Sequence, residues 1–164
     1  MTESAIKTDH NAALNGGKFL SFFLGSEEYG IEILRVQEII GLIQITPVPK
    51  MPDFIRGIIN LRGKIIPIMD LRTRFNLPGV DDTEETCIIV VEDNNRHMGI
   101  VVDKVSEVAD LRADQMEEVP EIGLTGHNEF LMALGKTNTG VKMIIEISRV
   151  VFSEFRELSM GEAV

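Results

Sequence analysis

The residues that could support catalysis are few in this chain, and none of them completes a motif. Leu134–Gly135–Lys136–Thr137 ends like a phosphate-binding P-loop, but that motif requires a glycine five residues before Gly135, where the chain has Phe130. A P-loop also needs a helix after the loop, so that backbone N–H groups face the phosphates, whereas both flanks here are typical of strands. The fragment therefore does not predict a nucleotide site.

Metal-binding and nucleophilic side chains are scattered. No histidine has a second histidine or cysteine at ligand spacing, which argues against a zinc site at His10, His97 or His127. The acidic run over 81–85 could hold Mg²⁺ or Ca²⁺ loosely, but such a run is more often a flexible linker. Cys87 is expected to pack as a small buried thiol, and no serine stands in a G-x-S-x-G elbow. We expect no catalytic residue, metal or cofactor, and therefore a binding protein.

The most unusual polar residues form the segment Asn60–Leu61–Arg62–Gly63–Lys64. They separate two runs of branched apolar residues, 58–59 and 65–68, and so predict the turn of a hairpin. Gly63 is explained by the positive φ that a tight turn can require. Arg62 is not, because a turn needs no arginine for its geometry. Arg62 is the residue best explained by contact with a partner.

Charge is unevenly distributed along the 164 residues, whose formal net charge is −10. The excess of acid disfavours nucleic acid and anionic membrane as partners. Residues 50–75 hold six basic and two acidic side chains, whereas residues 81–129 hold fourteen acidic and three basic ones. Two surfaces of opposite charge would suit a molecule that lies between two partners, and the alternative is a solvated surface with accidental clustering. No apolar stretch is long enough to cross a membrane, so we expect no direct membrane insertion, and nothing directs the chain out of the cytoplasm.

The pattern of apolar residues predicts an all-β fold. Paired runs indicate hairpins over 19–33, 57–71, 87–102 and 130–147, and the strand pattern continues through Val105 and Val108. Three prolines within 45–52 indicate a stiff, extended connection. About eight to ten short strands at this spacing are typical of a barrel or a sandwich.

Helices are predicted to be short. The spacing of Ile33, Val36, Ile39 and Ile40 indicates about one helical turn. Asp70 is expected to cap a brief helix over 71–76, and Ser148 to cap a last helix that places Val151, Phe155 and Leu158 on one face. The segment 114–128 is expected to be a loop. We predict two small barrels divided by a link near 77–83, a flexible N-terminal tail over 1–17 and a C-terminal tail over 159–164.

Several blocks, in order, resemble the CheW family of bacterial chemotaxis coupling proteins. They are Gly25–Ile33, Val36–Ile39, Asn60–Gly63 with Pro67 and Asp70–Arg72, and Gly99–Val105. The resemblance covers 18–158 and implies a single CheW-like domain, built from two tandem SH3-like five-stranded β-barrel subdomains with a few short helices and a C-terminal helix. Since no receiver domain, kinase core or phosphotransfer helix accompanies it, the chain resembles a stand-alone coupling module.

The resemblance also implies function and partners. It implies a non-enzymatic adaptor that couples the cytoplasmic hairpin tips of methyl-accepting chemoreceptors to the regulatory domain of the histidine kinase CheA. Such an adaptor scaffolds receptor–kinase arrays, permits receptors to control kinase activity and can form ring assemblies with CheA. It would be cytoplasmic and recruited to membrane-associated chemoreceptor arrays.

The family pattern assigns two binding surfaces to residues of this chain. The receptor-binding positions are Val36, Glu38, Gly57, Asn60, Leu61, Arg62 and Gly63, and Glu38 is expected to pair with Arg62. The kinase-binding positions are Ile39, Ile40, Gly41, Glu117 and Ile122, the last of which stands where the family often has an aromatic residue. Structural roles are the alternatives: core packing for Val36, Ile39 and Ile40, turn geometry for Gly57 and Gly63, and local backbone bonding for Asn60 and Asp70.

Two other functions remain open as rivals. A small β-barrel that binds RNA or single-stranded DNA would need a basic face with interleaved aromatic residues, and 50–75 contains only Phe54 and Phe75. A hydrolase that uses the acids of 81–85 with a divalent metal would be stabilised thermally by that metal.

Overall fold

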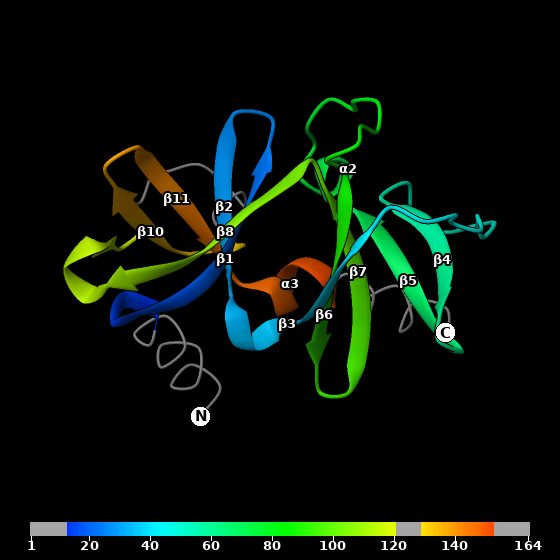
Figure 1. Ribbon diagram of the computed structural model, residues 1–164, viewed down its shortest axis with the longest axis horizontal. Helices are drawn as coiled ribbons and strands as arrows, with labels where there is room; N and C mark the ends of the chain where they lie inside the picture. Colours follow the sequence, from blue (N-terminus) through cyan, green and yellow to red (C-terminus); the bar gives the residue numbers. More distant parts are fainter. Residues whose placement is uncertain (1–12, 121–128, 153–164) are drawn as a thin grey trace. The chain divides into compact units, whose positions relative to one another are not determined.

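The computed structural model describes residues 13–120 and 129–152 (Figure 1). Most of the regular structure in these ranges is β-strand, so the predicted predominance of strands is confirmed. The chain forms two compact units: unit 1 comprises 1–21, 27–33 and 106–164, and unit 2 comprises 22–26 and 34–105. Among the described residues, no helix has the length and apolar character needed to cross a membrane.

A six-stranded sheet forms the framework of unit 1. Its strand order is β8-β1-β2-β11-β10-β9, with β11 parallel to β2 and antiparallel to β10. The strands are β1 (Gly16–Leu24), β2 (Glu27–Glu32), β8 (Lys104–Arg112), β9 (Met116–Glu117), β10 (Leu131–Thr137) and β11 (Gly140–Ile145). A 3₁₀ turn, η2 (Ala113–Gln115), precedes β9, and a short helix, α3 (Ile147–Val151), follows β11.

The core of unit 1 is largely apolar, and a charged side chain, Lys142, is buried beside it. Phe19, Leu111 and Ile144 are among the buried side chains that pack together. Lys142 is also buried, with 5% of its side chain exposed, and its Nζ donates to Ser21 Oγ at 2.8 Å and to Glu28 Oε2 at 2.7 Å. A buried ammonium group is tolerated only when it is paired in this way.

A five-stranded sheet forms unit 2, in the order β3-β6-β7-β5-β4. The two hairpins β4–β5 and β6–β7 are antiparallel, and the parallel pairing of β5 with β7 joins them. The strands are β3 (Val36–Gly41), β4 (Ile55–Leu61), β5 (Lys64–Asp70), β6 (Cys87–Asp93) and β7 (Arg96–Val102). A 3₁₀ turn, η1 (Ile33–Arg35), precedes β3, and the helix α2 (Leu71–Arg74) follows β5.

The two outer strands of the unit 2 sheet are linked by the chain that follows β3. Thr46 and Ile58 exchange two backbone hydrogen bonds of 2.9 Å, so the segment after β3 pairs with β4. The chain after β3 therefore reaches the opposite edge of the sheet. Buried residues of the apolar core of unit 2 include Ile59, Ile66 and Ile88, and Ile40 and Leu61 pack against them.

The link over 77–83 lies inside unit 2 and does not separate the two units. Strands on either side of it belong to the same sheet, because β3 pairs with β6 and β5 pairs with β7. Local apolar patterns identify strands but not their distant partners, which is why the sequence placed a boundary here. In unit 1 the strand count is six, because the two-residue β9 joins the five longer strands.

The chain becomes ordered earlier than the sequence suggested. Ala13 is 2% exposed and belongs to the core of unit 1, and β1 begins at Gly16, so the predicted flexible tail does not extend to residue 17. Residues 1–12 lie outside the described part of the chain, as does the predicted C-terminal tail over 159–164. The predicted hairpins are all present.

Three predictions about helices need adjustment. The predicted turn exists only as η1, and Val36 onward is strand, because apolar spacings of three and four in so short a run fit either structure. Asp70 caps α2 through Thr73 N as predicted, but the helix ends at Arg74. The last helix begins at Ile147 with Glu146 as its N-cap, so Ser148 is not the cap, and Phe155 and Leu158 lie outside the described residues.

The predicted loop over 114–128 is partly regular. Its first residues belong to η2 and β9, and β9 pairs with β10 through Met116 and Glu117. Pairing with a distant strand again explains the difference. Residues 121–128 lie outside the described ranges.

Candidate functional site

The turn between β4 and β5 is a two-residue loop, formed by Arg62 and Gly63. The antiparallel register closes at the pair Leu61 and Lys64. Arg62 has φ 52° and Gly63 has φ 85°, and two positive φ values are the mark of the type I′ turn that suits the twist of a hairpin. Asn60 Oδ1 accepts a hydrogen bond of 2.8 Å from Gly63 N and braces the loop.

Arg62 projects from this turn and pairs with Glu38 of β3, as predicted. The Arg62 Nη2 atom donates to Glu38 Oε1. The arginine side chain is 70% exposed and the glutamate side chain 27% exposed. An exposed pair of this kind adds only about 0–1 kcal/mol to stability, so its main effect is to orient the guanidinium group.

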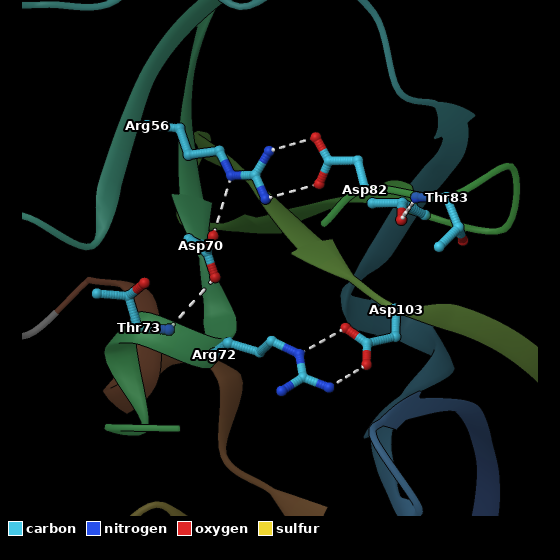
Figure 2. Close-up of polar contacts among 8 residues, drawn as sticks. Arg56, Asp70, Arg72, Thr73, Asp82, Thr83 and Asp103 are labelled. Carbon is cyan, nitrogen blue, oxygen red and sulfur yellow. Dashed lines mark hydrogen bonds and ion pairs between the residues drawn. The ribbon is translucent and has the colours of Figure 1, made fainter. Parts of the chain in front are cut away.

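The base of the same hairpin is fixed by a second arginine (Figure 2). Arg56 Nε donates to Asp70 Oδ2 at 3.0 Å, and the two terminal nitrogens of Arg56 bind both oxygens of Asp82 at 3.0 and 3.2 Å. The hydrogen bonds that Arg56 donates to Asp82 are the main reason that the pKa of Arg56 is raised; burial opposes this shift, and the bond to Asp70 adds to it. A forked arginine pair restrains geometry as well as charge. Arg56 therefore ties β4 to the end of β5 and to the link.

A third arginine holds the other side of the link. Arg72 binds Asp103 through Nε at 2.8 Å and through Nη2 (Figure 2). The Nη1 atom of Arg72 donates to Pro78 O at 2.8 Å. Asp103 also accepts from Gly25 N at 2.7 Å. The hydrogen bond from Arg72 is the main reason that the pKa of Asp103 is lowered. Sequence reasoning named Asp70 as a helix cap and a family marker and Arg72 as a family marker, but it missed both clusters, since nothing in the local pattern pairs residues so far apart.

The predicted receptor-binding residues divide into exposed and buried groups. Asn60, Arg62 and Gly63 are exposed at the turn, and Glu38 is half-buried beside them. Val36 begins β3 and is half-buried. Leu61 packs against the core of unit 2, and Gly57 is buried.

Gly57 has a structural requirement of its own. Its φ is 147°, and a Cβ atom there would lie 2.1 Å from Thr46 O. The glycine therefore permits the close pairing of Thr46 with β4. This observation supports the structural alternative for Gly57.

The predicted kinase-binding residues do not form one group either. Ile39 is 45% exposed and Gly41 is exposed, whereas Ile40 is half-buried and packs on the core of unit 2. Glu117 lies in unit 1, where its Oε1 accepts from Lys136 Nζ at 2.6 Å. Ile122 lies outside the described residues. From Glu38 onward the register of β3 with β6 is regular, so alternation along the strand directs Glu38 and Ile40 to one side and Ile39 and Gly41 to the other.

Lys64, beside the turn, contacts a histidine that the sequence did not connect to it. His97 Nε2 lies 3.4 Å from Lys64 Nζ and 3.8 Å from Glu92 Oε2. Glu92 and His97 face each other across β6 and β7, which a hairpin register predicts, but the contact with β5 follows from the parallel pairing of β5 and β7.

The geometry does not support the catalytic alternatives. Gly135 and Lys136 lie within β10 and pair with β11, so the P-loop-like fragment has neither the loop nor the helix that phosphate binding needs. Cys87 is half-buried, and desolvation raises the pKa of its thiol, which disfavours the nucleophilic thiolate. Among residues 13–120 and 129–152, no three metal-binding side chains gather. Asp82 of the acidic run is held by Arg56, and Glu85 by Lys104 at 3.3 Å.

Comparison with known proteins gives one consistent result. The CheW-like domain family matches residues 18–154. The chemotaxis protein CheW of Klebsiella aerogenes is 46% identical over 139 residues, which cover 85% of this chain and 84% of that protein. The chemotaxis protein CheW of Helicobacter pylori is 31% identical over 84% of this chain and 83% of its own length.

A solved structure agrees with these sequence matches. The crystal structure of the scaffolding protein TtCheW from Thermoanaerobacter tengcongensis superposes with a TM-score of 0.74 at 37% sequence identity. The superposition covers 80% of this chain and 89% of that one.

Proposed function

Because this chain belongs to the CheW family of chemotaxis coupling proteins, we propose that its turn at Arg62 binds the chemoreceptor and that the outer side of β3 binds the kinase CheA. Members of the family are non-enzymatic adaptors that couple chemoreceptors to CheA. The protein therefore acts by holding two partners and not by chemistry.

The single observation that carries the receptor assignment is the placement of Arg62. The arginine side chain is largely exposed and projects from a turn that is braced by Asn60. Glu38 orients its guanidinium group. The hairpin below it is anchored by Arg56. An exposed, oriented guanidinium is suited to bind carboxylates or backbone carbonyls on the tip of a receptor hairpin. Exposed Asn60 and Gly63 extend this surface, and we assign Val36, Gly57 and Leu61 to its support.

The kinase surface rests on β3 and on unit 1. Ile39 offers an exposed apolar side chain on the outer strand of the unit 2 sheet, and Gly41 permits close approach of a partner's backbone. We also assign Glu117 and Ile122 to the kinase-binding residues, because they match kinase-binding positions of the family. Ile40 is a core residue that supports Ile39 from the opposite side of the strand.

The remaining expectations follow from family membership. We propose that 18–158 acts as one CheW-like domain, that each unit is an SH3-like barrel, and that the protein works in the cytoplasm at membrane-associated receptor arrays. The pairing of Thr46 with Ile58, which joins the outer strands of unit 2, supports the barrel for that unit. Ring assemblies with the regulatory domain of CheA belong to the same proposal.

The test is a pair of titrations, against a soluble receptor cytoplasmic hairpin and against the CheA regulatory domain, with wild type and Arg62→Ala. We expect the variant to bind the hairpin at least about tenfold more weakly, because charge-assisted hydrogen bonds contribute about 1.5–3 kcal/mol, and to bind the kinase domain as wild type does. Arg112→Ala is the matched control, since Arg112 is 71% exposed and pairs with Asp114 in unit 1. Unchanged hairpin binding by Arg62→Ala would contradict the assignment.

A further inference from the structure

Unit 2 contains the same kind of turn twice, with different residues at the first central position. The β6–β7 hairpin closes at the pair Asp93 and Arg96, and its loop residues Asn94 and Asn95 have φ 51° and 63°. The β4–β5 hairpin closes with Arg62 and Gly63 at φ 52° and 85°. One turn therefore uses Asn where the other uses Arg, at nearly equal φ.

The difference is informative because the left-handed region does not suit the two residues equally. Asparagine tolerates positive φ through local hydrogen bonding, whereas a long side chain with a Cβ atom has no such compensation. The β6–β7 turn has Asn at both central positions, as this preference predicts. Arg62 is consequently placed against the conformational preference of its position.

Two interactions hold Arg62 in this conformation. Asn60 Oδ1 accepts from Gly63 N at 2.8 Å, which fixes the residue that follows Arg62, and Glu38 binds the guanidinium group. Asn60 itself is exposed and directed to the turn, so its carboxamide oxygen is engaged within the chain. In the β6–β7 turn the residue that precedes the loop, Asp93, is instead engaged with Arg35 and Arg96 at 3.1 and 3.4 Å.

We infer that Asn60 is a positioning residue of the receptor surface: its side-chain oxygen stabilises the unfavourable backbone conformation that presents Arg62. The inference rests on the proposed function, because it assumes that Arg62 contacts the receptor. It changes the role of Asn60 from a partner contact to a brace that acts through Arg62. It also predicts that stability and binding oppose each other at residue 62.

The first test compares reciprocal substitutions in the two turns. Arg62→Asn gives the β4–β5 turn the residue found in the β6–β7 turn, and we expect a higher thermal midpoint together with at least about tenfold weaker binding to a soluble receptor hairpin. Asn94→Arg makes the opposite change at the other turn, and we expect a lower midpoint with unchanged binding. A lower midpoint for Arg62→Asn would overturn the inference that Arg62 is strained.

The second test is a double-mutant cycle on hairpin affinity. Asn60→Ala should weaken binding by about threefold to tenfold, since a lost hydrogen bond reduces the population of the competent turn, while Asn60→Asp keeps the acceptor oxygen and should retain most of the affinity. In an Arg62→Ala background, Asn60→Ala should have little further effect. Equal effects in both backgrounds would show that Asn60 contacts the receptor directly and would overturn the inference.

Hydrogen exchange provides a readout without a partner. The Gly63 amide should exchange faster in Asn60→Ala than in wild type or Asn60→Asp, because the bond to Oδ1 is lost. If Arg62→Ala leaves hairpin binding unchanged, the proposed function fails. If Arg62→Ala weakens binding and Asn60→Ala changes neither exchange nor affinity, only the positioning role fails.

Discussion

Replacing Gly57 by alanine tests whether this glycine serves the fold of unit 2 or a partner. A Cβ atom at this position would lie 2.1 Å from Thr46 O and 2.7 Å from Thr46 C. Real Cβ atoms do not approach backbone atoms so closely, so Thr46 has to move. Its two hydrogen bonds to Ile58, both 2.9 Å, are then lost or weakened.

The magnitude follows from three contributions. Holding alanine at φ 147° costs about 1–3 kcal/mol, and loss of two hydrogen bonds costs about 0.5–1.5 kcal/mol each. Reduced freedom of the unfolded chain offsets about 0.4–1 kcal/mol of this. We therefore expect Gly57→Ala to lower the free energy of unfolding by about 1–6 kcal/mol.

Urea unfolding followed by circular dichroism measures this change. Gly41→Ala is the matched control, because Gly41 also lies in an outer strand of the same sheet, has no positive φ, and has no atom within 4 Å of the added Cβ. Its free energy of unfolding should stay within about 1 kcal/mol of wild type. A wild-type midpoint for Gly57→Ala would refute the structural account of Gly57 and return it to the receptor surface.

Three further predictions concern other parts of the chain. Lys142→Ala leaves Glu28, whose side chain is 16% exposed, without its partner and should lower the free energy of unfolding by about 1–3 kcal/mol in urea unfolding; an unchanged free energy of unfolding would contradict the stabilising pair. Since Arg72 lowers the pKa of Asp103, the charged carboxylate stabilises the fold above its unfolded pKa, and the contribution is lost as pH falls through the folded value. The stability difference between wild type and Asp103→Asn should therefore shrink between pH 7 and pH 2 in unfolding experiments, and a constant difference would argue against the pair. Ile39→Asp should lower the affinity for the CheA regulatory domain, measured by titration, and leave the affinity for the receptor hairpin unchanged. Equal loss of both affinities would indicate a folding defect.

Local sequence signals predicted the hairpins of this fold well. The runs on either side of Arg62 and Gly63 are apolar and short, and a two-residue turn between such runs leaves one register. The capping of α2 by Asp70 was predictable for the same reason, because donor and acceptor are three residues apart. These elements depend on neighbours in the chain.

Pairings between distant segments were not predictable from local pattern. The parallel contact of β5 with β7 and the pairing of Thr46 with Ile58 join residues that no periodicity connects. Because of these pairings, the link over 77–83 lies within unit 2, and the backbone of Thr46 lies close to Gly57. The pair between Glu38 and Arg62 was expected only from the family resemblance, and the φ of Arg62 was not expected at all.

The central claim is that one chain holds receptor and kinase at the same time. The most direct measurement is sedimentation velocity of this protein, a soluble receptor hairpin and the CheA regulatory domain. Each component is measured alone, then in each pair, and then all three together. We predict a ternary species that is larger than either binary complex, and we predict that Arg62→Ala removes the receptor from it while leaving the kinase complex. Mutual displacement of the two partners, with no ternary species at any ratio, would contradict the claim.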